Sequence, residues 1–419
     1  MIKSHIVVAI GLQIMISSAT AQALSIDSCY ALAVRNYPLI EEYELIEKTK
    51  EYTLSNAGKA YLPQVSVTAI EGYIFGGLPA LGAPGGNSEK SSNFKFIGLG
   101  QVNQTIWDGG ATKAQKNIIK ASSETDKASV DVSLYDLRSR VNQVYFSILL
   151  VDEQLKQLDV QDTILNNNIS RIKQLSDNGL AFKTDVDEIR VEKLKLDQQR
   201  REYHYVRNGY MSMLSLLIGA KIDEQTTLVK PQPPQTSEMQ INRPELSLYK
   251  NQRNLLNAQS GMQRVSLMPK IGVLGAGVVF APGISFGNSK LSTIGVVGLS
   301  ASWNIGGLYK NSNEKHLTQL ALDKVNVQEQ TFLFNTNLQV SQASENIEKQ
   351  RAVLADDEEI ITLRKSIRLG YQVKYNNGVS PLLDLLNAIA REGEANAQKS
   401  LHEMQLLTTL YDYKTITGN

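Results

Sequence analysis

The sequence contains a single cysteine, Cys29, among 419 residues. One cysteine excludes an internal disulfide bond. The residues before it, Ile26-Asp27-Ser28, lack the small side chains that precede a lipidated cysteine. We therefore expect neither a disulfide cross-link nor a lipid anchor, and we expect Cys29 to be a small buried apolar residue.

An excess of charge of either sign is also missing, since 43 Lys and Arg stand against 42 Asp and Glu. This balance removes the usual electrostatic basis for binding nucleic acid. The four histidines are scattered and lack the spacing of metal ligands. Gly275-Ala276-Gly277 has Phe280 where a dinucleotide fingerprint needs a third glycine. We expect no enzymatic activity, no metal and no cofactor. Without a phosphate-binding loop, energy for any transport must come from a partner.

Proline is absent from two long segments, 110–179 and 307–378. Because proline breaks a helix interior, its absence permits one long helix in each segment. The first segment also carries mostly apolar residues at the spacing of a coiled coil. These positions are Val144, Ile148, Val151, Leu155, Leu158, Asp162, Leu165, Ile169 and Ile172. A helix of about 65 residues is roughly 100 Å long, which a compact globular domain does not accommodate easily.

Residues 1–23 have the pattern of a secretory signal peptide. Lys3 supplies a positive charge, residues 6–16 are apolar, and small residues permit cleavage after Ala21 or Ala23. A short buried helix is the alternative interpretation. We expect the mature chain to be exported.

The mature chain is a tandem duplication. Pro38 and Pro63 recur 206 residues later as Pro244 and Pro269. Three further residues recur with a shift of 199: Gly179, Asp185 and Gly219 match Gly378, Asp384 and Gly418. A unit of this length is too long for a solenoid repeat. We predict a first repeat over 24–230, a linker with three prolines over 231–242 and a second repeat over 243–419.

Each repeat is expected to contain the same elements in the same order. A helix between two prolines (38–63, 244–269) precedes a β-hairpin (about 64–107, about 270–305) with a loop rich in glycine and proline. A very long helix (about 110–178, about 307–377) and a returning helix (about 181–219, about 380–417) follow, and glycine turns join them. The uncharged stretches 271–289 and 291–309 could instead be two membrane helices. Pro282 and nine glycines in these stretches disfavour that alternative.

The only two tryptophans, Trp107 and Trp303, lie near the ends of the hairpins. Tryptophan at a strand end is typical of the interface between membrane and water. A buried tryptophan at a corner between strand and helix is the alternative. Four strands cannot close a useful barrel alone, so hairpins in a membrane would have to be shared among several chains.

The order of these features resembles the TolC family of outer-membrane efflux proteins over essentially the whole mature chain. The resemblance rests on the signal peptide, the duplication, the proline before each hairpin, Trp107-Asp108-Gly109-Gly110 and the Gly-x₅-Asp turns. It implies an α+β membrane protein in which the long coiled-coil helices and hairpins of three chains combine. The homotrimer would form a 12-stranded outer-membrane β-barrel and a periplasmic α-helical barrel in a Gram-negative bacterium.

The resemblance also implies a passive exit duct within a tripartite efflux or type I secretion system. Its partners would be a periplasmic adaptor (membrane fusion) protein, an inner-membrane transporter and outer-membrane lipid. Drug, metal and protein cargo all stay open. An exported coiled-coil scaffold or adhesin without a pore is the alternative, but it leaves the two uncharged hairpins unexplained.

The resemblance places the channel gate and the adaptor contacts at two helix tips, Leu175–Asp185 and Tyr375–Asp384. The candidate residues are Gly179, Asp185, Gly378, Asp384 and Asn387. A ring of carboxylates from symmetric chains would favour cations, whereas an aspartate that only stabilises a helix N-terminus is the alternative. Well-studied members of the family have an arginine and a second aspartate where this chain has Ser380 and Asn387. We therefore expect a more weakly latched entrance.

Overall fold

The computed structural model describes residues 24–73, 94–223, 226–234, 240–282 and 292–419. The proposed signal peptide and the greater part of both predicted hairpin loops lie outside the described residues. The chain divides into two compact units, each formed by segments from both halves of the sequence. Unit 1 comprises residues up to 40, 134–241 and 337–419, and unit 2 comprises residues 41–133 and 242–336.

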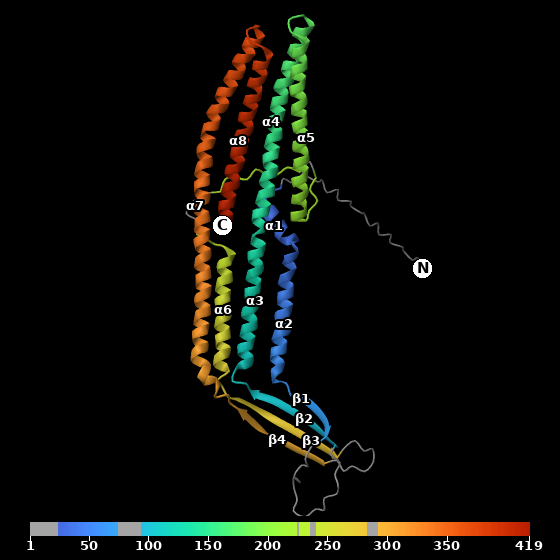
Figure 1. The fold of residues 1–419 in the computed structure, drawn as a ribbon, viewed down its shortest axis with the longest axis vertical. Coiled ribbons are helices and arrows are strands. Elements are labelled where there is room, and N and C mark those ends of the chain that lie inside the picture. Colours follow the sequence, from blue (N-terminus) through green and yellow to red (C-terminus); the bar gives the residue numbers. More distant parts are fainter. Residues whose placement is uncertain (1–23, 74–93, 224–225, 235–239, 283–291) are drawn as a thin grey trace, which may run out of the picture. The chain divides into compact units, whose positions relative to one another are not determined.

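Unit 1 is built from two helical hairpins and a short helix. Helices α4 (Leu137–Asp177) and α5 (Lys183–Ile218) form the first hairpin. Helix α7 (Gly307–Asn376), whose second part belongs to this unit, forms the second hairpin with α8 (Leu382–Thr417). The two hairpins lie side by side, and their turns are at the same end (Figure 1). Helix α1 (Ile26–Asn36) packs against α4 and α5 at the other end of α5.

Two apolar clusters hold unit 1 together. The first surrounds α1, where Cys29 is fully buried and packs with residues of α4, α5 and α8. Burial raises the pKa of the Cys29 thiol to about 12, so the side chain is an inert part of the core. The second cluster lies nearer the turns and joins α4, α5 and α8. Most of the coiled-coil positions predicted on α4 are buried in these two clusters.

Unit 2 contains a four-stranded antiparallel sheet and four helical segments. The helices are α2 (Glu42–Gly58), α3 (Ala111–Tyr135), α6 (Pro244–Val265) and the first part of α7. The strands are β1 (Gln64–Tyr73), β2 (Phe94–Trp107), β3 (Lys270–Pro282) and β4 (Ser292–Ser302). Their order is β1-β2-β3-β4, so β2 and β3 join the two halves and β1 and β4 are the edges. The stretches that could have been membrane helices therefore contain strands.

Among the described residues, no helix is long and apolar enough to cross a membrane.

Three details differ from the sequence prediction. The first long helix is interrupted at Asp136, which separates α3 from α4, although Asp136 keeps helical angles of φ −62° and ψ −20°. The segment 38–63 is a 3-10 turn, α2 and a second 3-10 turn rather than one helix. Helix α1 was not predicted. Its sequence signals are weak, since only Ile26, Cys29 and Ala33 form its buried face.

Candidate functional site

Both helical hairpins of unit 1 turn through the same backbone motif. In the first, Gly179 has a φ of +74°, the Leu180 N–H donates to Leu175 O at 2.8 Å and the Gly179 N–H donates to Ser176 O at 3.0 Å. The second hairpin repeats this pattern with Gly378 at φ +71°, and equivalent bonds of 2.8 and 3.0 Å. These are Schellman motifs, which need a residue that tolerates positive φ. At both turns, the positive φ of the glycine thus lets backbone N–H groups satisfy the last carbonyl groups of the helix.

The aspartate after each turn is bound within its own helix start. Asp185 Oδ2 accepts the backbone N–H of Phe182 at 3.1 Å. Pro381, which occupies the same position in the second turn, has no N–H to donate. There Asp384 Oδ2 instead accepts the Ser380 hydroxyl at 2.7 Å. Both carboxylates thus lie in the first turn of a helix, where the helix dipole stabilises them. Their proposed role in a pore stays a prediction.

Side chains of both hairpins meet in an apolar cluster close to the turns. Tyr375, at the end of α7, packs against the apolar cluster that includes Ile172 of α4, Ile189 of α5 and Leu385 of α8. The last three are fully buried. The pKa of Tyr375 is raised by burial and by the nearby Asp185 carboxylate. The structure therefore packs Tyr375 of the second tip segment into the same apolar cluster as Ile172 and Ile189, which flank the first tip segment.

The outer surface of the turns is apolar and exposed. Leu180 and Phe182 on the first turn are 75% and 78% exposed, and Val379 and Leu383 on the second are 73% and 57% exposed. Large apolar side chains gathered on one end of a protein commonly mark a site of protein contact. Sequence reasoning identified the glycines and aspartates here but not these four apolar residues.

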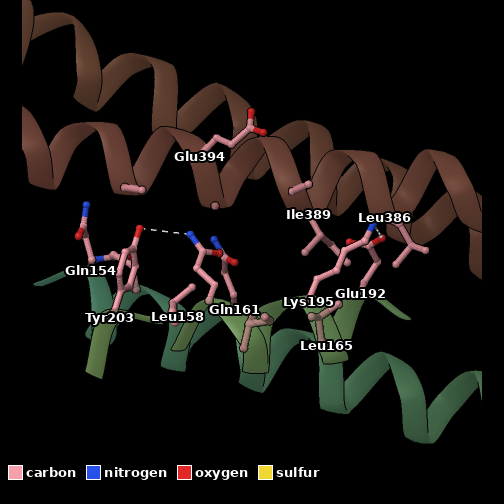
Figure 2. A pocket seen from close by; sticks show the side chains of 16 residues that line it. Gln154, Leu158, Gln161, Leu165, Glu192, Lys195, Tyr203, Leu386, Ile389 and Glu394 are labelled. Atoms are coloured by element: carbon pink, nitrogen blue, oxygen red, sulfur yellow. Dashed lines mark hydrogen bonds and ion pairs between the residues drawn. The ribbon is translucent and has the colours of Figure 1, made fainter. Parts of the chain in front are cut away.

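Two adjoining cavities run from the turns along the space between the hairpins. The one nearer the turns is about 620 Å³ and lies between α5 and α8, where Asn387 is part of its wall. The other, about 300 Å³, is bounded by α4, α5 and α8 (Figure 2). Both cavities share Glu192, Lys195, Leu386 and Ala390. We call these two adjoining cavities together the inter-hairpin groove.

Amide and charged side chains form part of the lining of the inter-hairpin groove. In Figure 2, Gln154, Gln161 and Tyr203 extend from α4 and α5 toward α8. Gly393 of α8 allows this approach, because a Cβ there would lie 1.7 Å from the Gln161 amide nitrogen. Charged residues on the groove are mostly acidic, and its lysine, Lys195, is already paired with Glu192 at 2.7 Å. The groove thus presents amides and carboxylates.

Ion pairs, and in the second hairpin also a histidine–aspartate hydrogen bond, connect the two helices within each hairpin. In the first, Lys193 of α5 pairs with Asp162 of α4 at 2.6 Å. Burial alone would raise the pKa of Asp162, but the bond to Lys193 outweighs it and the pKa is lowered. In the second, Arg368 of α7 pairs with Glu392 of α8, and His402 Nδ1 lies 2.7 Å from Asp357 Oδ2. Each hairpin is thus tied internally by charge.

The two tryptophans lie in unit 2, at the helix-proximal ends of β2 and β4. Trp107 is 42% exposed and Trp303 is 58% exposed, so neither is buried in this chain. The Trp303 indole N–H donates to Leu267 O at 2.9 Å, which fixes the ring beside the end of α6. An exposed ring with a bound N–H is compatible with a membrane interface, and that role remains a prediction.

The fold is that of known outer-membrane channels. The alignment with CusC covers 94% of this chain and 91% of the CusC chain, with a TM-score of 0.65 at 12% identity. VceC from Vibrio cholerae covers 94% of both chains with a TM-score of 0.64 at 12% identity. The CmeC outer membrane channel of Campylobacter jejuni covers 94% of this chain and 85% of its own, with a TM-score of 0.61 at 15% identity. No family model and no curated protein matches the chain.

These structures belong to the TolC family, so the resemblance predicted from the sequence is confirmed for the fold. At this low identity the likeness establishes the architecture of duplicated helical hairpins and a small antiparallel sheet.

Proposed function

We propose that this chain is one protomer of a trimeric exit duct in the outer membrane of a Gram-negative bacterium. Three chains would combine their sheets into a 12-stranded barrel and their hairpins into a periplasmic helical barrel. The duct would conduct substrates passively from an inner-membrane transporter and a periplasmic adaptor. Similarity of fold to outer-membrane channels over 94% of the chain carries this proposal.

The sheet supports assembly from several chains. Its edge strands β1 and β4 have no neighbour on one side within the described chain. In hydrocarbon, every backbone N–H and C=O needs a partner, so an open edge has to be closed. Both edges also expose apolar side chains, with Val67 at 80%, Val297 at 81% and Leu299 at 82%. Joining β1 of one chain to β4 of the next satisfies the backbone and leaves an apolar surface for lipid.

The alternation along β1 indicates which face meets the lipid. Val65, Val67 and Ala69 share one face, whereas Gln64, Ser66 and Thr68 share the other. Barrel strands of the outer membrane alternate in this way, with apolar residues outward and polar residues inward. We therefore assign Val67 to the lipid and Thr68 to the lumen.

The turns of the two hairpins are the proposed contact with the adaptor. Their exposed apolar residues and the acidic inter-hairpin groove lie at the same end of unit 1. A helical adaptor with apolar and basic residues at its tip would match this surface. Gly179, Asp185, Gly378, Asp384 and Asn387 are the residues that we assign to the entrance.

Membrane fractionation and trimer analysis test the duct. We expect the full chain in the outer-membrane fraction and a trimer in mild detergent that dissociates on heating. Val67→Arg should reduce trimer yield, because a cation facing the middle of the membrane costs about 2–4 kcal/mol. Thr68→Arg, one residue away, is the matched control and should assemble normally. A fully soluble periplasmic protein would exclude the duct and favour the scaffold or adhesin alternative.

Single-channel recording tests the entrance. We expect a weakly closed resting state in which Asp384→Ala raises the open probability, while Glu394→Gln, farther along α8, leaves it unchanged. A closed state that is insensitive to Asp384→Ala would reject the proposed latch.

A further inference from the structure

A separate cavity between α4 and α8 lies away from the turns and from the inter-hairpin groove. Its volume is about 300 Å³, at the lower end of the range of about 300–1,000 Å³ typical of sites for small molecules. Phe146, Leu150 and Met404 give it an apolar wall, and Ser147 and Thr408 add hydroxyl groups. Asp412 of α8 contributes the only carboxylate among the residues that line it.

The Asp412 carboxylate uses only part of its capacity to accept hydrogen bonds. Its one hydrogen bond among the described residues comes from the Asn142 side-chain amide at 3.3 Å, and it has no ion-pair partner there. An ionised carboxylate offers about four acceptor positions. Burial raises the pKa of Asp412, and the bond from Asn142 opposes this shift only in part. A half-buried carboxylate with one long hydrogen bond is stabilised when a cation approaches it.

The surrounding network holds Asp412 in place. Asn142 is fully buried, and its amide oxygen accepts the Tyr30 hydroxyl, so its NH₂ group has to point toward α8. That NH₂ group also donates to the Thr415 hydroxyl at 3.2 Å. The nearby cation Arg138 is placed over the rings of Tyr30 and Tyr135, 5.6 and 4.9 Å from their centres. Its guanidinium is thus stacked on aromatic rings rather than paired with the carboxylate.

We propose that this cavity binds a small organic ammonium ion, with its charge beside Asp412 and its apolar part against Phe146 and Met404. The carboxylate provides the charge, and the hydroxyls of Ser147 and Thr408 accept remaining N–H groups. Phe146 packs against Tyr411 with ring centres 5.2 Å apart, so the Phe146 ring is supported from outside the cavity. An inorganic cation fits less well, because three of the lining side chains are large and apolar.

A bound ligand would provide a further contact between the two hairpins. Since α4 belongs to the first hairpin and α8 to the second, an occupant contacts both. A ligand that binds only the folded chain raises its stability according to its concentration and affinity. Binding at this site does not depend on the proposed duct, and a soluble or monomeric chain could be tested in the same way.

The test measures binding of benzylammonium to the full-length protein in detergent by calorimetry and by thermal unfolding. We expect a rise in Tm and saturable binding to the unaltered chain. Benzyl alcohol has a similar shape without the charge, and ammonium chloride has the charge without the ring, so both should bind at least tenfold more weakly. Asp412→Asn should weaken benzylammonium binding at least tenfold.

A second variant protects the test against misfolding of Asp412→Asn. Ser147→Phe fills the cavity without changing its charge and should abolish binding, whereas Ser139→Ala, a smaller change at the cavity wall, should retain it. Equal binding of benzylammonium to the unaltered chain and Ser147→Phe, or no binding at millimolar concentration, would overturn the proposal. Equal responses to benzylammonium and ammonium chloride would also overturn it.

Discussion

The α4–α5 and α7–α8 hairpins have the same backbone turn, yet different donors hold the aspartate that follows it. In the first turn the backbone N–H of Phe182 binds Asp185. In the second, Pro381 removes that donor, and the Ser380 hydroxyl replaces it. The position equivalent to Ser380 in the first turn is Ala181, which could not do so. The duplication has thus kept the geometry while one side chain compensates for a lost backbone hydrogen bond.

The hairpins also differ in what covers their far ends. Gly219 ends α5 with a φ of +64°, and the Asn36 side chain from α1 donates to the Leu216 carbonyl at 3.1 Å. Gly418 ends α8 with a φ of +86°, and there the Asn419 side chain donates to Gln240 O at 3.0 Å. Helix α1 therefore caps the first hairpin, whereas a segment without regular secondary structure meets the second. The asymmetry lies at the ends away from the turns.

Apolar packing between the hairpins should contribute more to the free energy of unfolding than any feature in which the two hairpins differ. Leu385 is fully buried in the cluster that joins both hairpins. Leu385→Ala should lower the free energy of unfolding by about 2–5 kcal/mol, through lost burial and a residual cavity. Urea unfolding of the detergent-solubilised chain, followed by circular dichroism, measures this loss. Leu383→Ala, at a 57% exposed side chain, is the control and should change stability by about 0.5 kcal/mol or less.

Similar losses at Leu383 and Leu385 would contradict this assignment of the inter-hairpin contact to the buried leucine.

The two turns should respond equally to loss of glycine. Gly179→Ala and Gly378→Ala each place a Cβ at positive φ and should cost about 1–2 kcal/mol. Gly370→Ala provides the control, because this glycine lies inside α7 with open space around it. That change should stabilise the helix by about 0.5–1 kcal/mol. Thermal unfolding of all three variants compares the turns directly, and unequal losses at Gly179 and Gly378 would mean that the motifs are not equivalent.

The turns could be predicted because their signal is local. Asn followed by Gly at 178–179 and 377–378 indicates a helix end that needs positive φ, and the shift of 199 residues repeats it. Long helices and strands were likewise indicated by proline-free segments and by changes in period. Helix α1 was missed, although Ser25 caps it by accepting the Ser28 N–H at 3.2 Å. Its three buried residues are too few for a clear helical period.

The groove and the cavity could not be predicted because they depend on the alignment between helices far apart in the sequence. Nothing in the local sequence places Gln161 of α4 against Gly393 of α8. Similarly, Asn142 and Asp412 are 270 residues apart, and only the packing of α4 on α8 brings them together. The partnership of Ser380 with Asp384 was within reach, since a serine beside a proline and four residues before an aspartate was visible in the sequence.

Acid should affect the segment after β2 but not the corresponding segment after β4. Asp108 follows β2 and accepts hydrogen bonds from the backbone N–H groups of Gly110 and Thr112 at 2.8 and 2.6 Å, and from the Tyr61 hydroxyl at 2.8 Å. Burial alone would raise the pKa of Asp108, but these bonds outweigh it and lower the pKa to about 2. Asn304, which follows β4 in the second half, does not titrate.

Because the folded-state pKa of Asp108 is lowered, its contribution is present above the ordinary aspartate range and is lost as pH falls toward 2. Asp108→Asn should cost about 1 kcal/mol at pH 7, as loss of a helix-capping acceptor does. Urea unfolding between pH 7 and pH 3 should show the unaltered chain approaching the variant as pH falls. Asn304→Asp is the converse variant, because it places a titratable carboxyl group after β4. A constant gap between the unaltered chain and Asp108→Asn over this range would refute the proposed protonation.

A change of one hydroxyl group isolates the difference between the turns. Ser380→Ala gives the second turn the alanine of the first, but Pro381 still provides no N–H, so Asp384 loses its donor. We expect a loss of about 0.5–1.5 kcal/mol, the net contribution of one hydrogen bond. Ala181→Ser adds a hydroxyl where Asp185 already has the Phe182 N–H and should be nearly neutral. The double change Ser380→Ala and Asp384→Ala should cost less than the sum of the two single changes, because both single changes remove the same hydrogen bond. Strictly additive losses would show that the two side chains act independently.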